Sequence, residues 1–165
     1  MIAWENRTLE ERTLLNPAFC STLLWHAARG REAGGKELLS IEETFVVLPL
    51  VLPASTREAL PGAITTSLPV WLAENPIEQR RIAERAKALL PFTRTALTFG
   101  AMHGLLRLEG TRVMPSIDSG KVVKKVLKQA SEEVRNCALK AEFVGKWFGK
   151  AGSSSTVLAL LGVRP

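Results

Sequence analysis

The stretch 67-SLPVWLAENPIEQRRIAERAKALLPFTRTALTFGAMHGLLRLEGTRVMP-115 decides the fold, because its turn-forming residues divide it into helices and a hairpin. Ser67 and Asn75 stand at helix N-cap positions, and proline follows Asn75 at the position that favours it most. Pro91 lacks a backbone N–H and clashes with the preceding turn. The second helix should therefore break or kink there, and a third helix should run from Phe92 to His103.

A hairpin should follow the third helix. Gly104 is the expected helix stop, and the segments 105-LLRLE-109 and 111-TRVMP-115 face each other across Glu109 and Gly110. Three helices followed by a short hairpin is the order of elements in a winged helix. We therefore predict a mainly α protein with a small β-hairpin (α+β), in which a winged-helix-like core is flanked by N-terminal helices and a long C-terminal helix.

Length and composition favour one domain over residues 1–165. We expect N-terminal helices over 1–62, the winged-helix-like core over 63–117, and a long basic helix with a tail over 118–165. Apolar residues make up 46% of the chain and charged residues 23%, with no apolar run long enough to span a membrane and no leader sequence. We expect a soluble, cytoplasmic protein.

Metal, cofactor and catalytic motifs do not stand out in this sequence. Cys20 and Cys137 fall at apolar helical positions without metal-ligand spacing, and free buried thiols are expected. His26 and His103 lie on or beside apolar helical faces, where a lone histidine is usually structural. We predict a protein that is not an enzyme and that needs no metal, cofactor or small-molecule substrate.

The segment 30-GREAGGK-36 matches a phosphate-binding loop only superficially. Asn16 and Pro17 start a helix that should end near Gly30, so a helix precedes the loop where a strand is required. Glu37 occupies the position of the magnesium-binding hydroxyl. We predict no nucleotide binding at this loop.

Residues 40–53 begin with a capping-box pair, Ser40 and Glu43, which predicts a helix start. The apolar run 48-LPLVLP-53 that follows must be buried. Its sequence fits either the end of a kinked helix or an extended segment.

The C-terminal region shows an apolar seam with alternating spacings of four and three. Its residues are Val123, Leu127, Ala130, Val134, Cys137, Ala141, Val144 and Phe148. We expect one long helix whose seam packs inside the protein, on another protein or on a second copy. The net charge of +6 arises almost entirely here, since residues 121–150 hold 8 basic and 3 acidic residues.

This helix is the predicted docking element. Its lysines, including Lys121, Lys124, Lys125 and Lys128, form a solvated face that suits acidic protein partners better than phosphate backbones. We expect Trp147, Phe148 and Phe143 to anchor a partner, because Gly145 and Gly149 allow another backbone to approach closely.

Nucleic-acid contacts have weaker support. The expected third helix offers Arg94, and the hairpin offers Arg107 and Arg112. Specific base reading requires several such side chains on one recognition helix. DNA contact is therefore expected at most indirectly or through the phosphate backbone.

Several strings together resemble a known family. They are LLNPAF (14–19), LPLVLPASTREALP (48–61), TSLPVWLAENP (66–76), ERAKALLPFTRTAL (84–97), FVGKWFGKAG (143–152) and GVRP (162–165). This order of strings is similar to the middle component of bacterial three-component ABC (ABC-3C) systems.

The resemblance implies a small non-enzymatic adaptor that couples an SMC/Rad50-like ABC ATPase to a variable effector. Such systems, which include the Lamassu type, defend bacteria against phage and plasmids. The resemblance implies no catalytic residues. The alternative is a winged-helix transcriptional regulator that dimerises on DNA, and that alternative requires base-reading side chains on the third helix.

Overall fold

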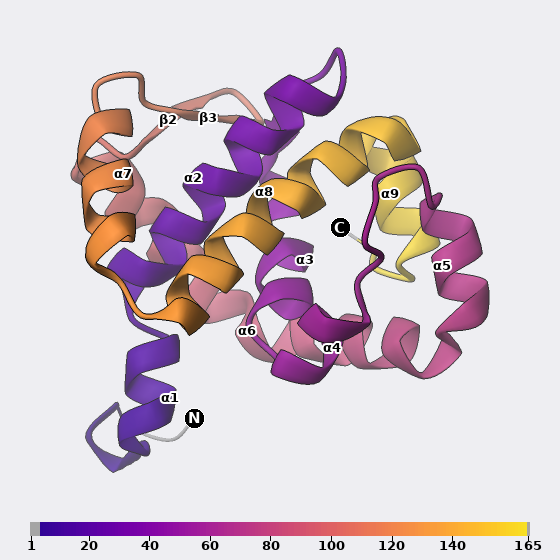
Figure 1. Ribbon diagram of the computed structural model, residues 1–165, viewed down its shortest axis with the longest axis horizontal. Helices are drawn as coiled ribbons and strands as arrows, with labels where there is room; N and C mark the ends of the chain where they lie inside the picture. The colour runs from indigo at the N-terminus through magenta and orange to yellow at the C-terminus, as the bar shows by residue number, and fades with distance from the viewer. Residues whose placement is uncertain (1–3, 165) are drawn as a thin grey trace.

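The computed structural model describes residues 4–164, which form a mostly helical protein with a small sheet (Figure 1). The elements are η1 (Trp4–Asn6), α1 (Leu9–Leu14), α2 (Pro17–Gly34), β1 (Leu39–Ser40), α3 (Ile41–Val51), α4 (Ala54–Ala59), α5 (Leu68–Glu74), α6 (Pro76–Met102), β2 (Leu106–Glu109), β3 (Arg112–Pro115), α7 (Gly120–Gln129), α8 (Glu132–Ala151) and α9 (Ser154–Leu160). The mainly α, α+β class is confirmed.

The N-terminal helix starts follow the capping residues. The Asn16 side chain accepts a hydrogen bond from the Ala18 N–H at 2.8 Å, and Ser40 and Glu43 form both halves of a capping box. α3 continues to Val51 with Pro49 inside it, so residues 48–51 are helical and the extended alternative is wrong.

Pro91 does not end a helix. α6 runs without interruption from Pro76 to Met102, so α5 and α6 replace the three helices expected before the hairpin. Pro91 removes one N–H bond and crowds the preceding turn, but α6 packs on α2 and α3, with Ile82 before the proline and Ala96 after it both buried, and this packing offsets the cost. The winged-helix assignment is therefore not confirmed.

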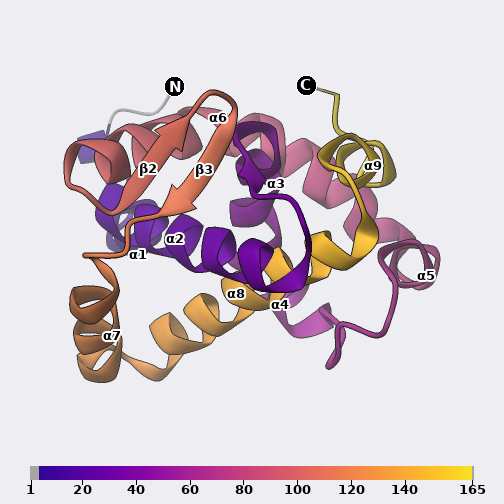
Figure 2. The same cartoon turned by 90° about the horizontal axis from the view of Figure 1, so that it is seen from above.

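The predicted hairpin is present, and it belongs to a three-stranded antiparallel sheet with the order β1-β3-β2. Gly104 (φ +67°) and Gly110 (φ +58°) take left-handed conformations at the helix stop and at the hairpin turn. β1 pairs with β3 through Leu39 opposite Val113, which the sequence analysis did not predict. The sheet lies over α2 and α6 (Figure 2).

The expected long C-terminal helix is wrong, because the chain forms two helices, α7 and α8. Ala130 is extended (ψ 162°), and Ser131 caps α8 by accepting a hydrogen bond from the Val134 N–H at 3.3 Å. Ser131 is followed by two glutamates in the first turn of α8, and these local start signals prevail over the heptad pattern. The two helices point in different directions (Figure 1).

α2 and α8 pack side by side in the centre of the protein (Figures 1 and 2). Gly30 and Gly34 on α2 face the backbone of α8, and Gly145 and Gly149 on α8 face the backbone of α2. A Cβ at any of the four would overlap backbone atoms of the opposite helix. Glycine is required on both helices because the two backbones are in contact.

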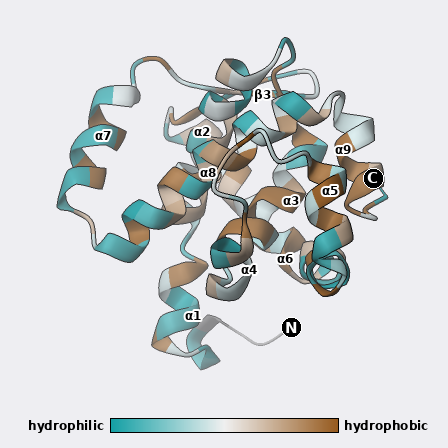
Figure 3. Cartoon of the chain, turned by 45° about the vertical axis from the view of Figure 1, so that its right-hand side comes forward, coloured by the Kyte–Doolittle hydropathy of each residue, from teal (hydrophilic) through white to brown (hydrophobic). Residues whose placement is uncertain are grey.

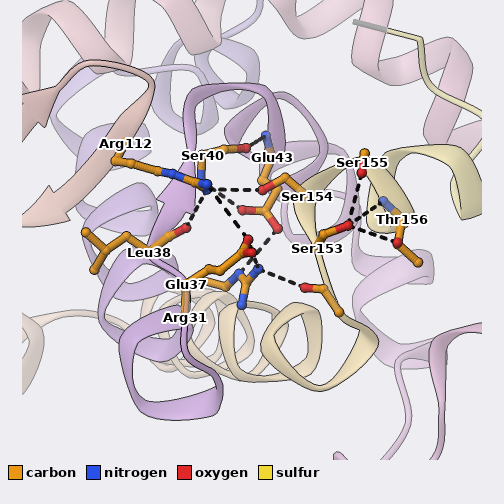
Figure 4. A network of polar contacts seen from close by, with 11 residues as sticks. Arg31, Glu37, Leu38, Ser40, Glu43, Arg112, Ser153, Ser154, Ser155 and Thr156 are labelled. Atoms are coloured by element: carbon orange, nitrogen blue, oxygen red, sulfur yellow. Dashed lines mark hydrogen bonds and ion pairs between the residues drawn. The ribbon is translucent and has the colours of Figure 1, made fainter.

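A buried ion pair connects α2 to α3 (Figure 4). Arg31 and Glu43 are both buried, with 3.3 Å between Arg31 Nε and a Glu43 carboxylate oxygen. Arg31 also donates to the Gly152 carbonyl at 3.0 Å, while Glu43 accepts from the Ser40 N–H at 2.8 Å. The pair therefore holds the start of α3 and the end of α8 against α2.

Candidate partner-binding surface

The predicted docking anchors at the end of α8 are core residues. Trp147 and Phe148 are 1% and 0% exposed, and the Trp147 Nε1–H donates to the Thr66 carbonyl at 2.7 Å. The Trp147 ring lies edge-on to the Trp71 ring, with 5.4 Å between centroids. Phe143 is half-buried beside Trp147, with a centroid distance of 5.9 Å.

The expectation of exposed anchors is therefore corrected. The backbone that approaches Gly145 and Gly149 is that of α2 in the same chain. Of the three alternatives left open for the seam, packing inside the protein holds for its α8 part, whose Cys137, Ala141 and Val144 are buried. A sequence signal for this packing existed, because Gly30 and Gly34 have the same four-residue spacing as Gly145 and Gly149.

The four lysines proposed for docking lie on α7, at the edge of the protein (Figure 1). All are exposed, and none forms an ion pair with any residue from 4 to 164: Lys121, Lys124, Lys125 and Lys128. α7 contains no acidic residue. Four unpaired positive charges on ten residues make this helix the most basic exposed element among the described residues.

α7 also exposes apolar side chains. Val122 and Val126 are 60% and 57% exposed, while Val123 is buried against the body of the protein. Figure 3 shows hydrophobic and hydrophilic segments alternating along this helix. A helix that exposes two valines beside four lysines presents both apolar contact area and charge to a partner.

A groove borders the valine side of α7. It has a volume of about 710 Å³ and lies between α1, α7 and the first turns of α2 and α8. Its lining includes Leu9, Phe19, Val123, Val126 and Val134. We define the partner-binding surface as this groove together with α7.

The candidate DNA-contacting arginines are not one free basic group. Arg107 pairs with Glu109 at 3.2 Å, and Arg112 donates to the Leu38 carbonyl at 3.2 Å within the polar network of Figure 4. Arg94 is exposed on α6 and forms no ion pair with a described residue. The hairpin arginines are thus largely occupied by contacts within the protein.

The superficial phosphate-loop match falls mostly within a helix. α2 continues to Gly34, four residues beyond the predicted end near Gly30, because both glycines pack on α8. Lys36 is exposed in the short link to β1. No strand precedes this segment in residues 4–34, so its geometry differs from that of a phosphate-binding loop.

The titratable core groups are shielded from solvent. Burial raises the pKa of Cys20 to about 12 and raises the pKa of Cys137, and both thiols are free. Burial lowers the pKa of His26, which lies 3.8 Å from Glu142, whereas His103 is exposed and stacks on Phe99. The described residues contain no cluster of three metal-ligating side chains.

Among residues 4–164, no helix combines the length and the hydropathy that are needed to cross a bilayer.

Comparison with known proteins identifies a protein family. The family model described as ABC-three component (ABC-3C) system Middle Component 3 matches residues 4–165, which is nearly the whole chain. No curated protein and no solved structure matches the chain.

Proposed function

The chain belongs to the ABC-three component system Middle Component 3 family, and from that membership we propose that it is a non-enzymatic adaptor subunit. A middle component of a multi-subunit system implies protein partners. The proposed partners are an SMC/Rad50-like ABC ATPase and an effector subunit, which the adaptor couples in the cytoplasm. The proposed role of the complex is Lamassu-like defence of a bacterium against phage and plasmids.

One observation carries the proposal beyond family membership. α7 holds four exposed lysines and two exposed valines, and none of the lysines pairs with a described residue. Exposed like charges on one short helix repel one another, so they do not stabilise the isolated fold. They suit an acidic protein partner, whose association they would accelerate.

Co-purification tests the proposal. The three components are co-expressed with an affinity tag on this chain, and we expect the ATPase and the effector to elute with it. Changing Lys121, Lys124, Lys125 and Lys128 to Glu should weaken this association, more strongly at low than at high salt, because screening reduces the charge effect.

A matched control variant changes the net charge of the protein by the same amount. Lys36, Arg80, Lys87 and Lys150 are exposed on other elements and form no ion pair with a described residue, and their replacement by Glu should leave assembly intact. If the tagged chain is purified alone at micromolar concentration, while the co-expressed ATPase and effector elute separately from it, the adaptor role is refuted.

The non-enzymatic part of the proposal has its own test. Lys36→Ala removes the lysine of the loop that resembles a phosphate-binding motif, and we expect full protection of cells by the complete system. Loss of protection with a normally folded Lys36→Ala protein would contradict this proposal.

A further inference from the structure

The groove beside α7 offers mainly apolar contacts. Its polar lining groups are largely engaged within their own helices. Thr13 and Thr22 donate to carbonyls one turn earlier, Asn16 accepts from Ala18 and Phe19, and Ser131 accepts from Val134. A site for a polar small molecule needs free groups that converge on the ligand. This groove instead fits a row of apolar side chains.

One polar group in the groove lacks an acceptor. Arg12 lines the groove from α1, and its Nε is buried without a hydrogen-bond partner among the described residues. The nearby carboxylates have other contacts, since Glu11 closes the capping box with Thr8 and Glu133 pairs with Arg57 at 3.1 Å. The Arg12 side chain is partly exposed and forms no ion pair with a described residue, so its guanidinium can pair with a carboxylate that an occupant brings.

Lysines lie beside the α7 side of the groove without lining it. At 100° per residue, Lys121 and Lys125 lie on the outer edge of α7 next to Val122 and Val126. Lys124 lies on the other side of the helix, where it lines a second cavity with Trp25. The groove is thus lined mainly by apolar side chains, with Arg12 on its α1 side, Glu133 held by Arg57 on its α8 side, and the α7 lysines beside its rim.

We infer that this groove binds an amphipathic helix of a partner subunit, with apolar residues at i, i+3, i+4 and i+7 and acidic residues on both flanks. The apolar residues cover Leu9 and Val126, and the acidic flanks pair with Arg12 and with Lys121 and Lys125. A helix in an apolar groove is a recurring mode of recognition. The inference rests on the proposed adaptor function and specifies how one partner is held. A second copy of this chain is a poorer occupant, because it carries a net charge of +6.

Substitution in the groove tests the inference in the co-expressed complex. Val126→Glu adds a carboxylate to the groove wall at a position that is 57% exposed, so the isolated protein should melt at the wild-type temperature. Partner affinity, measured by titration of the purified subunit, should fall about tenfold or more. Val70→Glu is the matched control, since Val70 is also helical and is 50% exposed on α5.

Charge reversal at Arg12 and at Lys125 tests the α1 side and the α7 side of the groove separately. Arg12→Glu and Lys125→Glu should each weaken binding, whereas Lys124→Glu, with the same change of charge on the other side of α7, should weaken it several-fold less. A photo-crosslinking residue at position 126 identifies the occupant, and we expect crosslinks to an acidic helical segment of another subunit. Reversal of one acidic residue in that segment should restore binding to Arg12→Glu or Lys125→Glu.

The outcomes separate the inference from the proposed function. If the complex assembles but Val126→Glu binds like Val70→Glu, the groove inference fails and the adaptor function stands. Crosslinks to a second copy of this chain, or to a basic or extended segment, also overturn the inference. If the wild-type chain assembles with neither partner, the groove inference and the proposed adaptor function both fail.

Discussion

Gly145 on α8 lies directly against the backbone of Ala27 on α2, so that a Cβ at Gly145 would overlap the Ala27 carbonyl oxygen. Phe148, close to Gly145 around the helix, is fully buried, while Trp147 is buried from another direction, against the Trp71 ring and the Thr66 carbonyl. The contact with α2 and the packing on Trp71 therefore bury different sides of the end of α8, and the exposed lysines and valines lie on α7.

The glycine contact predicts a large effect of the smallest substitution. Gly145→Ala should destabilise the protein by about 3 kcal/mol, at the upper end of the range for overpacking, because backbone atoms of α2 cannot move aside as a flexible side chain would. Gly62→Ala is the control, since a Cβ there has no atom within 4 Å. Urea unfolding measures both, and equal midpoints for the two variants would contradict the predicted contact.

Truncation of Trp147 should destabilise the isolated protein. Trp147→Ala removes a side chain that is 1% exposed and should cost about 3 to 5 kcal/mol of unfolding free energy. Leu139→Ala, at a 65% exposed position on the same helix, should cost less than about 0.5 kcal/mol. Thermal unfolding of the two variants distinguishes a core role of Trp147 from a docking role. An unchanged melting temperature of Trp147→Ala together with lost partner binding would restore Trp147 as a docking anchor.

The buried Arg31–Glu43 pair should be sensitive to the loss of one partner. Arg31→Met leaves the fully buried Glu43 carboxylate without its counter-ion and should cost about 3 to 5 kcal/mol. Arg81→Met removes a half-exposed arginine that pairs with Glu78, and should cost at most about 1 kcal/mol.

A second substitution tests the cause of this loss. Glu43→Gln, added to Arg31→Met, should recover part of the stability because it removes the unpaired charge and keeps an acceptor for Ser40. No recovery in chemical unfolding would show that the Arg31 effect arises from packing alone.

His26 should make stability depend on pH near neutrality. Burial lowers its pKa below 6.5, and the nearby charge of Arg29 adds to that effect, while Glu142 opposes it. The unfolded chain therefore binds a proton at His26 that the folded protein does not, and stability should fall as the pH drops from 7 through 6.5 towards the folded pKa. Neither ring nitrogen has a hydrogen-bond partner among residues 4–164, so His26→Leu should flatten this decline without loss of a hydrogen bond.

Two comparisons separate the contribution of His26 to the pH dependence of stability from that of other groups. Burial raises the pKa of Glu142, but the hydrogen bond and charge of Lys146 lower it below 4.5 overall, so its contribution is lost only at more acidic pH. His103→Gln, which changes the exposed histidine, is the comparison variant. If His26→Leu and wild type lose stability in parallel between pH 7 and 5, another group is responsible.

Helix starts and turns were predictable where one residue carries the signal. Asn16 and Ser40 satisfy backbone N–H groups of their own helices, and Gly110 takes the left-handed turn of the hairpin. Pro91 and Ala130 were misjudged because each required weighing two signals. At Pro91 packing on both sides of the proline preserves the helix, and at Ala130 the cap at Ser131 overrides the heptad pattern.

The candidate site was predicted in part. The lysines of α7 were identified from their spacing and are exposed, but the groove and the free Nε of Arg12 were not, because α1 and α7 are more than a hundred residues apart in the chain. The anchors were misassigned because an apolar seam looks the same in sequence whether its partner is another protein or another helix of the same chain.

The sequence by itself determined the helical class, the hairpin and the concentration of positive charge in residues 121–150, because these depend on residue types and short spacings. Only the tertiary structure decided which apolar faces are core and which are surface. That choice depends on which backbones can approach each other, and the glycines of α2 and α8 allow contact between helices that are far apart in sequence. With α8 buried in this way, α7 is left at the edge with its lysines and valines exposed.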